Sequence, residues 1–308
     1  MKLLVINNLA SGYGEGAIYD YIRSLVVDGD EITIRSTDGT SDLRAFLYDA
    51  DEFDAVVAAG GDGTISSVSY QLADTGIPVV PFPAGTANLL AMNLDSPTEP
   101  HALAKMTREG RMMDFDIGEI ESSDGELFGF SIIAGAGYDA TIMKGASAGK
   151  KLLGPMAYFT SAVTHVTPQH ARFTLTIDGK KVKSEGVGVL IVNFSKIQFD
   201  LSLVHNNLPR DGMFDIVVLN TKDAFGLIPA LVACILDRSG EFPDRTDALE
   251  IHRGREITVE SDPPLLMQYD GEVTSRKTPF TVRMLPKAAR FIVSEDCIKS
   301  YAPDTNES

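Results

Sequence analysis

The feature that most constrains the fold is the order of apolar runs in the first hundred residues. Short β-branched runs such as "KLLVIN", "EITIRS", "DAVVAA" and "IPVVPF" alternate with helix-like segments such as "GAIYDYIRSLV", "DLRAFLYDA" and "TISSVSYQLAD". Apart from "EITIRS", these runs are not interrupted by polar residues, which is typical of strands buried on both faces of a parallel sheet. The sequence therefore predicts an α/β domain in which helices cover both faces of a parallel sheet.

The rhythm changes after about Asp116. From there, strand-like runs are separated by turn signals such as Asp178-Gly179 and Asp211-Gly212, which is typical of antiparallel sheets. We therefore expect two domains: a Rossmann-like nucleotide domain over residues 1–118, and a mainly antiparallel β-sandwich over residues 119–293. The segment 294–308 is expected to return to the first domain.

Three glycine-bearing loops follow strands of the predicted parallel sheet, at residues 8–16, 59–64 and 82–88. All three should open at the carboxyl edge, where ligands of such sheets bind. A glycine-rich loop before a helix offers backbone N–H groups to phosphate oxygens, although a single such loop can also be a plain turn. Asp62 would repel a phosphate unless a divalent cation lay between them, so the "GGDGT" loop implies Mg²⁺.

Composition excludes some partners and compartments. The formal net charge of −16 argues against non-specific nucleic-acid binding, which needs clustered Lys and Arg. The start, "MKLLVINN", has too few apolar residues for a signal-peptide core, which favours a cytoplasmic protein. The most apolar run, residues 224–236, contains Pro229 and is shorter than the ~20 residues needed to span a bilayer, so we expect a buried or interfacial helix.

Two features leave alternatives open. Lys144, Lys150 and Lys151 form either a functional basic cluster or a solvated face. The acidic turn in "QYDGEV", residues 268–273, is either a functional site or a hairpin, because Asp-Gly favours such turns.

The order of the motifs resembles the bacterial diacylglycerol-kinase-like lipid kinases over roughly residues 2–293. The matching stretches are "NLASG" (8–12), "GGDGT" (60–64), "FPAGTAN" (82–88), "DIG" (116–118), "GAGYDA" (135–140), "PRDGMFDI" (209–216) and "DGE" (270–272). "GGDGT" is shared with NAD kinases and resembles the phosphofructokinase loop, so it indicates only the superfamily. The later motifs, above all "DGE", make the resemblance to lipid kinases specific.

This resemblance implies transfer of the γ-phosphate of ATP to a lipid hydroxyl. It implies Glu272 as the general base with Asp270 beside it, Mg²⁺ near Asp62 and Asp116, and a second metal at Asp211 with the carbonyls of Leu208 and Met213. The nucleotide-binding residues implied by the motifs are Asn8, Gly12, Thr37, Gly60, Gly61, Asp62, Gly63, Thr64, Ser66, Ser67, Gly85, Thr86 and Asn88.

The chain departs from the family pattern at several positions. Leu9 replaces a proline, the segment before Asp211 lacks the usual Pro-x-Ala, and Leu89 stands where diacylglycerol kinases of this type often carry Asp. Some relatives that act on other lipids share this last change, so the acceptor is either diacylglycerol or a related membrane lipid.

The resemblance also implies peripheral contact with the inner face of the membrane, and it leaves a homodimer open. Two other functions are weighed against a lipid kinase. One is a soluble metabolite kinase of the NAD kinase type, and the other is a non-catalytic nucleotide or lipid sensor on the same fold.

Overall fold

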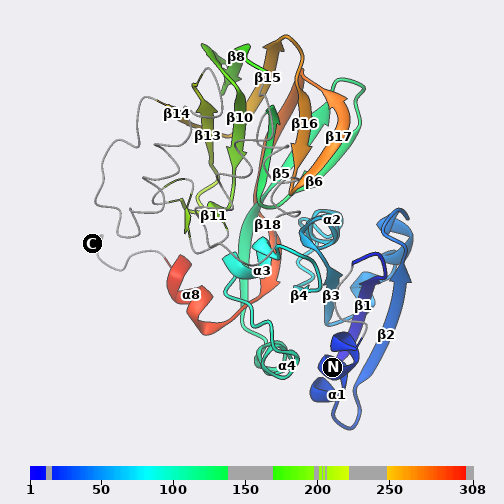
Figure 1. Ribbon diagram of the computed structural model, residues 1–308. Helices are drawn as coiled ribbons and strands as arrows, with labels where there is room; N and C mark the ends of the chain where they lie inside the picture. The colour runs from blue at the N-terminus through cyan, green and yellow to red at the C-terminus, as the bar shows by residue number, and fades with distance from the viewer. Residues whose placement is uncertain are drawn as a thin grey trace, which may run out of the picture. The chain divides into compact units, whose positions relative to one another are not determined.

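The computed structural model describes residues 1–11, 16–137, 169–197, 201–202, 204, 207–221 and 248–302 (Figure 1). The chain forms two compact units: unit 1 contains Met1–Ile117 and Pro286–Ser308, and unit 2 contains Gly118–Leu285. Strands β5 (Met112–Ser122) and β18 (Phe280–Ile292) each run from one unit into the other. Unit 1 takes in the chain from Pro286, earlier than the expected return at 294, because the end of the long β18 belongs to it.

Unit 1 is built on a parallel sheet. Its strands lie in the order β2-β1-β3-β4, with the bounds β1 Lys2–Asn8, β2 Glu31–Thr37, β3 Ala55–Gly60 and β4 Val79–Pro83. The end of β18 extends the sheet, where Phe291 pairs with Val79 of β4 in parallel. Every residue of β3 is buried, as the unalternating apolar run predicts for a strand covered on both faces.

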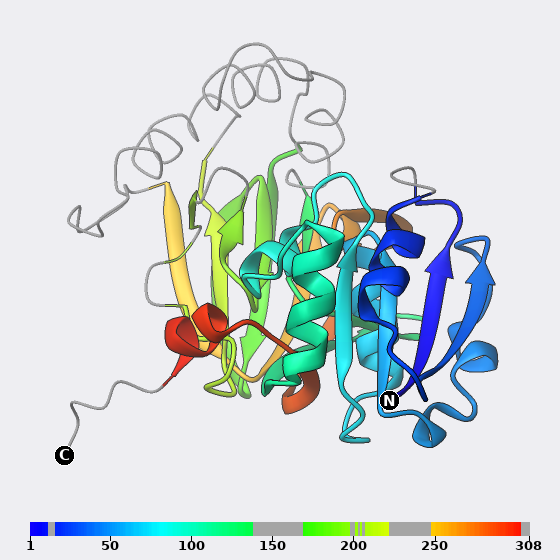
Figure 2. The same ribbon diagram turned by 90° about the horizontal axis from the view of Figure 1, so that it is seen from below.

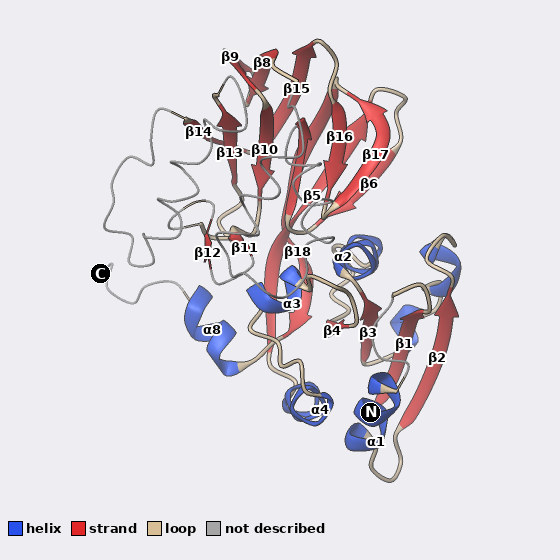
Figure 3. Ribbon diagram, in the orientation of Figure 1, coloured by secondary structure: helices blue, strands red, loops and turns tan. Residues whose placement is uncertain are grey.

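Helices cover both faces of this sheet (Figure 3). They are α1 Ala17–Leu25, α2 Asp62–Gln71, α3 Leu89–Asn93, α4 Pro100–Glu109 and α8 Glu295–Tyr301. Helices α1 and α4 lie side by side on one face (Figure 2), where they share a core with alternate residues of β1 and β3. The segment "DLRAFLYDA", expected to be a helix, forms two short 3₁₀ turns, η1 (Leu43–Phe46) and η2 (Ala50–Glu52).

Unit 2 contains two antiparallel sheets. One has the order β14-β13-β10-β7-β16-β17, with the bounds β14 Leu249–Gly254, β13 Phe214–Leu219, β10 Gly188–Val192, β7 Ile133–Gly137, β16 Leu266–Tyr269 and β17 Glu272–Lys277. The other is the antiparallel part of the ten-stranded sheet to which the strands of unit 1 also belong; it contains β18, β15 (Glu256–Asp262), β8 (Ala171–Ile177) and β9 (Lys180–Gly186), together with β5 and β6 (Leu127–Phe130). A small third ladder pairs β11 (Lys196–Ile197) with β12 (Leu201–Ser202).

The two larger sheets of unit 2 enclose a single apolar core. Phe130 of β6 stacks on Phe214 of β13 with ring centroids 5.6 Å apart, a geometry worth about 0.5–1.5 kcal/mol beyond burial. Gly118 makes room for this pair, because a Cβ there would lie 1.9 Å from Cε1 of Phe130. The expected fold class, a parallel α/β unit followed by a mainly antiparallel β-sandwich, is confirmed.

Candidate active site

The first glycine loop begins at Asn8, at the carboxyl end of β1. The Asn8 side chain donates a hydrogen bond to Oγ1 of Thr64 over 2.8 Å, and it accepts one from the Ala10 N–H over 2.9 Å. The next residue, Leu9, donates its N–H to the carbonyl of Thr37 at the end of β2, over 2.9 Å. Asn8 is thus bonded to Thr64, and its neighbour Leu9 is bonded to Thr37, so three residues predicted from separate motifs lie close together, since β1 lies between β2 and β3.

The "GGDGT" loop joins β3 to α2. Gly60 ends the strand, Gly61 is the N-cap of the helix, and Asp62 is its first residue. The first turn of any helix has N–H groups without an intrahelical acceptor, and these are a ready site for phosphate oxygens. Ser66 in this helix is buried, and its hydroxyl oxygen has no hydrogen-bond partner within the described residues. Ser67, the last residue of this predicted set, is half-buried.

The third loop packs directly on the second. Asn88 closes it, because its side chain accepts from the Gly85 N–H over 2.8 Å and donates to the Gly85 carbonyl over 3.1 Å. A Cβ on Gly85 would lie 2.5 Å from Cα of Gly61, so only glycine allows the two loops to approach this closely. Thr86 is exposed at the tip of the loop.

Asp62 also belongs to this pair of loops. Its Oδ1 accepts a 2.8 Å hydrogen bond from the N–H of Leu90, in the first turn of α3. Burial raises the pKa of the Asp62 carboxyl above its usual value, and the hydrogen bonds from backbone N–H groups offset part of this shift. Leu89, at the position where diacylglycerol kinases often carry Asp, is buried.

The second predicted Mg²⁺ ligand, Asp116, is a buried residue of β5. Its Oδ1 accepts a 2.7 Å hydrogen bond from the N–H of Lys287, a residue of β18 with φ of 54°. Within the described part of the chain, no group of three or more His, Cys, Asp or Glu side chains is placed to hold a metal ion. The two Mg²⁺ ligands predicted from the sequence, Asp62 and Asp116, therefore belong to no such group among the described residues of unit 1.

In unit 2, the "DGE" motif forms the turn of the β16–β17 hairpin, so the hairpin alternative is realised. Asp270 and Gly271 occupy the turn with φ of 44° and 83°, and Tyr269 pairs with Glu272 across it. Glu272 is exposed, and no hydrogen bond or ion pair holds its carboxylate within the described residues. A carboxylate in that state can accept a proton from a substrate hydroxyl.

Asp270 has a different task from Glu272. Its carboxylate accepts hydrogen bonds from three successive N–H groups, those of Ser131, Ile132 and Ile133, over 2.8, 2.8 and 3.1 Å. Its own N–H donates to the carbonyl of Ile133 over 2.8 Å. Asp270 therefore anchors the turn to the start of the neighbouring strand β7 and so fixes the position of Glu272, two residues later.

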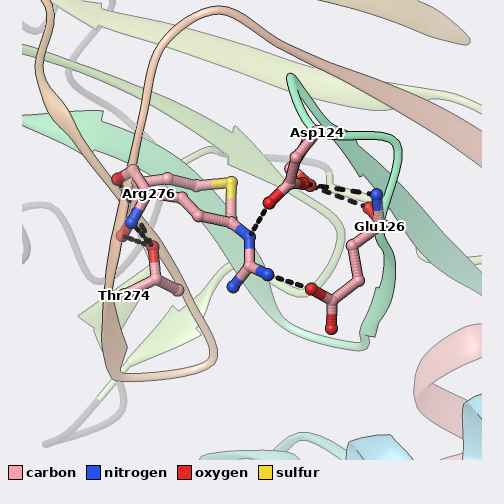
Figure 4. Close-up of polar contacts among 6 residues, drawn as sticks. Asp124, Glu126, Thr274 and Arg276 are labelled. Atoms are coloured by element: carbon pink, nitrogen blue, oxygen red, sulfur yellow. Dashed lines mark hydrogen bonds and ion pairs between the residues drawn. The ribbon is translucent and has the colours of Figure 1, made fainter.

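A second support for this hairpin was not foreseen from the sequence. Arg276 of β17 forms ion pairs with Asp124 and Glu126 (Figure 4). Its guanidinium also lies 4.7 Å from the centre of the Phe128 ring. The Phe128 ring in turn contacts Tyr269, with centroids 5.6 Å apart. Burial raises the pKa of the Tyr269 hydroxyl, and the nearby carboxylates of Glu272 and Asp270 raise it further.

The predicted second metal turn lies at the start of β13. Here Asp211 forms an ion pair with Arg253 of β14, and its other carboxylate oxygen accepts the Met213 N–H over 3.0 Å. Several other candidates, namely Gly12, the cluster of Lys144, Lys150 and Lys151, and the apolar run at 224–236, lie outside the described residues. Among the described helices, none has the length and apolar character needed to cross a bilayer.

Comparison with known proteins covers both units. The family "Diacylglycerol kinase catalytic domain" matches residues 2–120, and the family "YegS C-terminal NAD kinase beta sandwich-like domain" matches residues 132–293. A "Probable lipid kinase YegS-like" of Stenotrophomonas maltophilia is 25% identical, with 96% of both chains covered. An uncharacterized protein of Synechocystis sp. is 27% identical over 237 residues. The matched region covers 76% of this chain and 53% of the Synechocystis protein, which is longer.

Solved structures agree in fold. The crystal structure of a diacylglycerol kinase from Bacillus anthracis has a TM-score of 0.69 at 19% identity and covers 96% of this chain and 97% of that chain. An NAD kinase from Archaeoglobus fulgidus, solved in complex with ATP, has a TM-score of 0.55 at 13% identity and covers 97% of this chain and 96% of that chain. The family matches and the ordered motifs lead to one conclusion: the chain belongs to the diacylglycerol-kinase-like lipid kinase family, with a diacylglycerol kinase catalytic domain followed by a YegS-type C-terminal domain.

Proposed function

We propose that this enzyme, a lipid kinase by family, transfers the γ-phosphate of ATP to a hydroxyl of a membrane lipid. The observation that carries most weight is the joining of the three glycine loops in unit 1 by Asn8, Asp62 and Gly85. Phosphoryl transfer depends on positioning and charge neutralisation more than on covalent chemistry, and a set of loops fixed in this way supplies the positioning.

In this proposal, the three loops bind the phosphates of ATP through backbone N–H groups at the start of α2 and in the first and third loops. Asn8 and Asn88 hold the shape of the loops, while Thr37 and Thr86 border the nucleotide. Gly12 and Ser67 remain predicted members of the same site. The hydroxyl of Ser66, buried in α2 without a partner among the described residues, is a further candidate donor.

Asp62 and Asp116 are the proposed holders of Mg²⁺. Mg²⁺ in kinase sites is typically bound through one or two carboxylates plus the phosphates and several waters, so a pair of acids fits this ion. When bound, the ion would neutralise charge on the transferring phosphoryl group.

Glu272 is the proposed general base in unit 2, and it would accept the proton of the lipid hydroxyl. A base of this kind contributes roughly 10²–10⁴-fold to the rate. Asp270, whose carboxylate is occupied by three backbone N–H groups, is proposed to position Glu272 and not to exchange protons itself.

The acceptor resides in a membrane, so the enzyme must reach a bilayer surface. We propose peripheral contact at the cytoplasmic face of the inner membrane through the basic cluster Lys144, Lys150 and Lys151 and the apolar run 224–236. Co-sedimentation with anionic liposomes tests this, with wild type compared with a variant in which all three lysines are changed to Glu. Unchanged sedimentation of the variant would remove the cluster from the proposal. A homodimer stays a prediction, to be checked by sedimentation velocity.

The test of function is ATP-dependent labelling of a mixed lipid extract with Mg²⁺ and γ-labelled ATP. We expect one class of lipid to be labelled by wild type, and labelling to be lost in Asp62→Ala and Glu272→Gln. Glu260→Gln, an exposed acid on β15, is the matched control and should label normally. Labelled NADP from added NAD would favour a soluble metabolite kinase, and ATP binding without any labelled product would favour a sensor.

A further inference from the structure

In the turn from Leu208 to Met213, which the family resemblance marks as a metal site, the Leu208 carbonyl and the Asp211 carboxylate already bind donors of the protein itself. The Leu208 carbonyl accepts the N–H of Arg210 over 2.7 Å and that of Asp211 over 3.3 Å. One carboxylate oxygen of Asp211 accepts the Met213 N–H, and the other is paired with the guanidinium of Arg253. Two of the three expected ligands are therefore already engaged.

The sheet register places Arg253 at this turn. Arg253 of β14 lies directly opposite Asp215 of β13, and its Nε donates to Oδ1 of Asp215 over 3.1 Å. Its Nη2 reaches Asp211, so one guanidinium joins two carboxylates. A planar guanidinium has several N–H donors at fixed positions, so it can bind two carboxylates at once; the single ammonium of Lys lacks this arrangement.

Asp215 is a buried acid that is fully integrated into the fold. Its second oxygen accepts from Nδ2 of Asn207 over 2.9 Å, and the Asn207 carbonyl oxygen accepts from the Ser195 N–H over 3.1 Å. Asp215 is buried, and a buried carboxylate that is ionised needs a positive partner. Arg253 supplies that partner as a permanent positive charge.

A divalent ion at Asp211 would have to displace this arrangement. It would lie next to a guanidinium that the sheet register holds in place, and a divalent cation and a guanidinium repel each other at such short range. We infer that Arg253 takes the place of the second metal ion in this chain, so that unit 2 holds its Asp211 turn with a built-in cation and binds no divalent ion there.

The experiment measures Mn²⁺ binding by electron paramagnetic resonance, in full-length protein without nucleotide. Wild type and Asp211→Asn should bind the same number of Mn²⁺ ions, because Asp211 holds none. Arg253→Met removes the charge of this side chain, so Asp211 and Asp215 lose the cation that pairs with both of them. We expect this variant to gain an Mn²⁺ site at the Asp211 turn and to bind Mn²⁺ there at least on the order of tenfold more tightly than wild type does.

Thermal unfolding gives a second readout. Arg253→Met should unfold at a lower temperature than wild type and should recover on addition of Mn²⁺ or Ca²⁺, since a ligand that binds only the folded state stabilises it. Arg172→Met, which breaks an exposed ion pair with Asp262 elsewhere in unit 2, is the matched control and should show no recovery.

Arg253→Lys keeps a positive charge and covers the case in which Arg253→Met does not fold; it should gain no Mn²⁺ site. A wild-type Mn²⁺ ion that disappears in Asp211→Asn would overturn the inference. So would an Arg253→Met protein that folds and gains no site. Neither readout involves phosphoryl transfer, so these results stand apart from those that test the proposed function.

Discussion

The carboxylate of Asp62 accepts a 2.8 Å hydrogen bond from the backbone N–H of Leu90, so the first residue of α2 holds the first turn of α3. The same residue is the proposed Mg²⁺ ligand. One side chain thus joins two glycine loops and supplies negative charge at a site where burial opposes that charge. Asp62 therefore stabilises the fold through its hydrogen bond and destabilises it through its buried charge.

Asp62→Asn should stabilise the nucleotide-free protein at neutral pH while removing activity. The folded-state pKa of Asp62 is raised, so the folded protein binds this proton more tightly than the unfolded chain does, and stability rises as pH falls through the folded pKa. Asn carries no charge and can still accept from Leu90. The stability gain of the variant should therefore be largest at neutral pH and should shrink as wild type becomes protonated.

Thermal unfolding of both proteins from acid to neutral pH measures this difference. An Asp62→Asn protein less stable than wild type at neutral pH would contradict the assigned cost of burial. Asp62→Ala is the informative partner, because it removes the charge and the hydrogen bond together. It should be less stable than Asp62→Asn at every pH.

Gly61 and Gly85, which face each other where the second and third loops pack together, should differ sharply in how well they tolerate substitution by alanine. Gly85→Ala would place Cβ 2.5 Å from Cα of Gly61, so the backbone of the loops must shift. Gly61→Ala would place Cβ 3.5 Å from Cα of Gly85, which is ordinary contact distance. We expect calorimetry to show ATP affinity lost in Gly85→Ala and largely kept in Gly61→Ala. Equal affinity in both variants would mean that this close approach does not matter for nucleotide binding.

Of the two acids of the "DGE" turn, Asp270 should matter mainly for the stability of the fold and Glu272 mainly for turnover. Asp270→Asn keeps a residue type that tolerates positive φ but weakens the three N–H bonds to the carboxylate. Hydrogen bonds to charged groups contribute about 1.5–3 kcal/mol each, so we expect the free energy of unfolding to fall by at least about 1.5 kcal/mol. Glu272→Gln, at an exposed position, should leave stability unchanged and remove turnover. Urea titrations and lipid phosphorylation, measured on both variants, test this division.

Arg276 should affect catalysis through the hairpin. Arg276→Met removes the ion pairs to Asp124 and Glu126 and the cation over the Phe128 ring, all of which support the strand that begins at Glu272. We expect kcat for lipid phosphorylation to fall severalfold with ATP affinity unchanged, because the nucleotide loops are in unit 1. Arg172→Met, at an exposed pair, is the control. A variant with normal kcat would show that the hairpin needs no support from this cluster.

Much of unit 1 could be predicted from sequence because its information is local. Apolar runs without alternation marked the parallel strands, and the glycine loops fell where each strand ends. Sheet order then brought Asn8, Thr37 and Thr64 together. Helix α4 was not anticipated, although Pro100 in its first turn and Gly110 after its last residue, with φ of 62°, are ordinary signals for a helix start and stop.

The partners of the predicted acids could not be read from the sequence. Asp270 binds N–H groups more than a hundred residues earlier, and Asp116 binds the N–H of Lys287, far later in the chain. Arg253 reaches Asp211 only because β13 and β14 pair in one particular register. Such contacts depend on strand pairing across the sandwich, and no local pattern specifies that pairing.

Unit 1 contains a C-terminal segment, Pro286–Ser308, that is synthesised after all of unit 2. Unit 1 therefore cannot complete its fold during translation until the end of the chain has been made. Val79 of β4 pairs with Phe291 of β18. The ring centroid of Phe115 lies 6.0 Å from that of Phe291 and 5.5 Å from that of Tyr301. Both sets of contacts form only after these C-terminal residues have been synthesised. All of unit 2 leaves the ribosome in the meantime. An open strand edge in a nascent chain is a template for wrong pairing. Unit 1, whose strands β1 to β4 are synthesised first, is thus completed last.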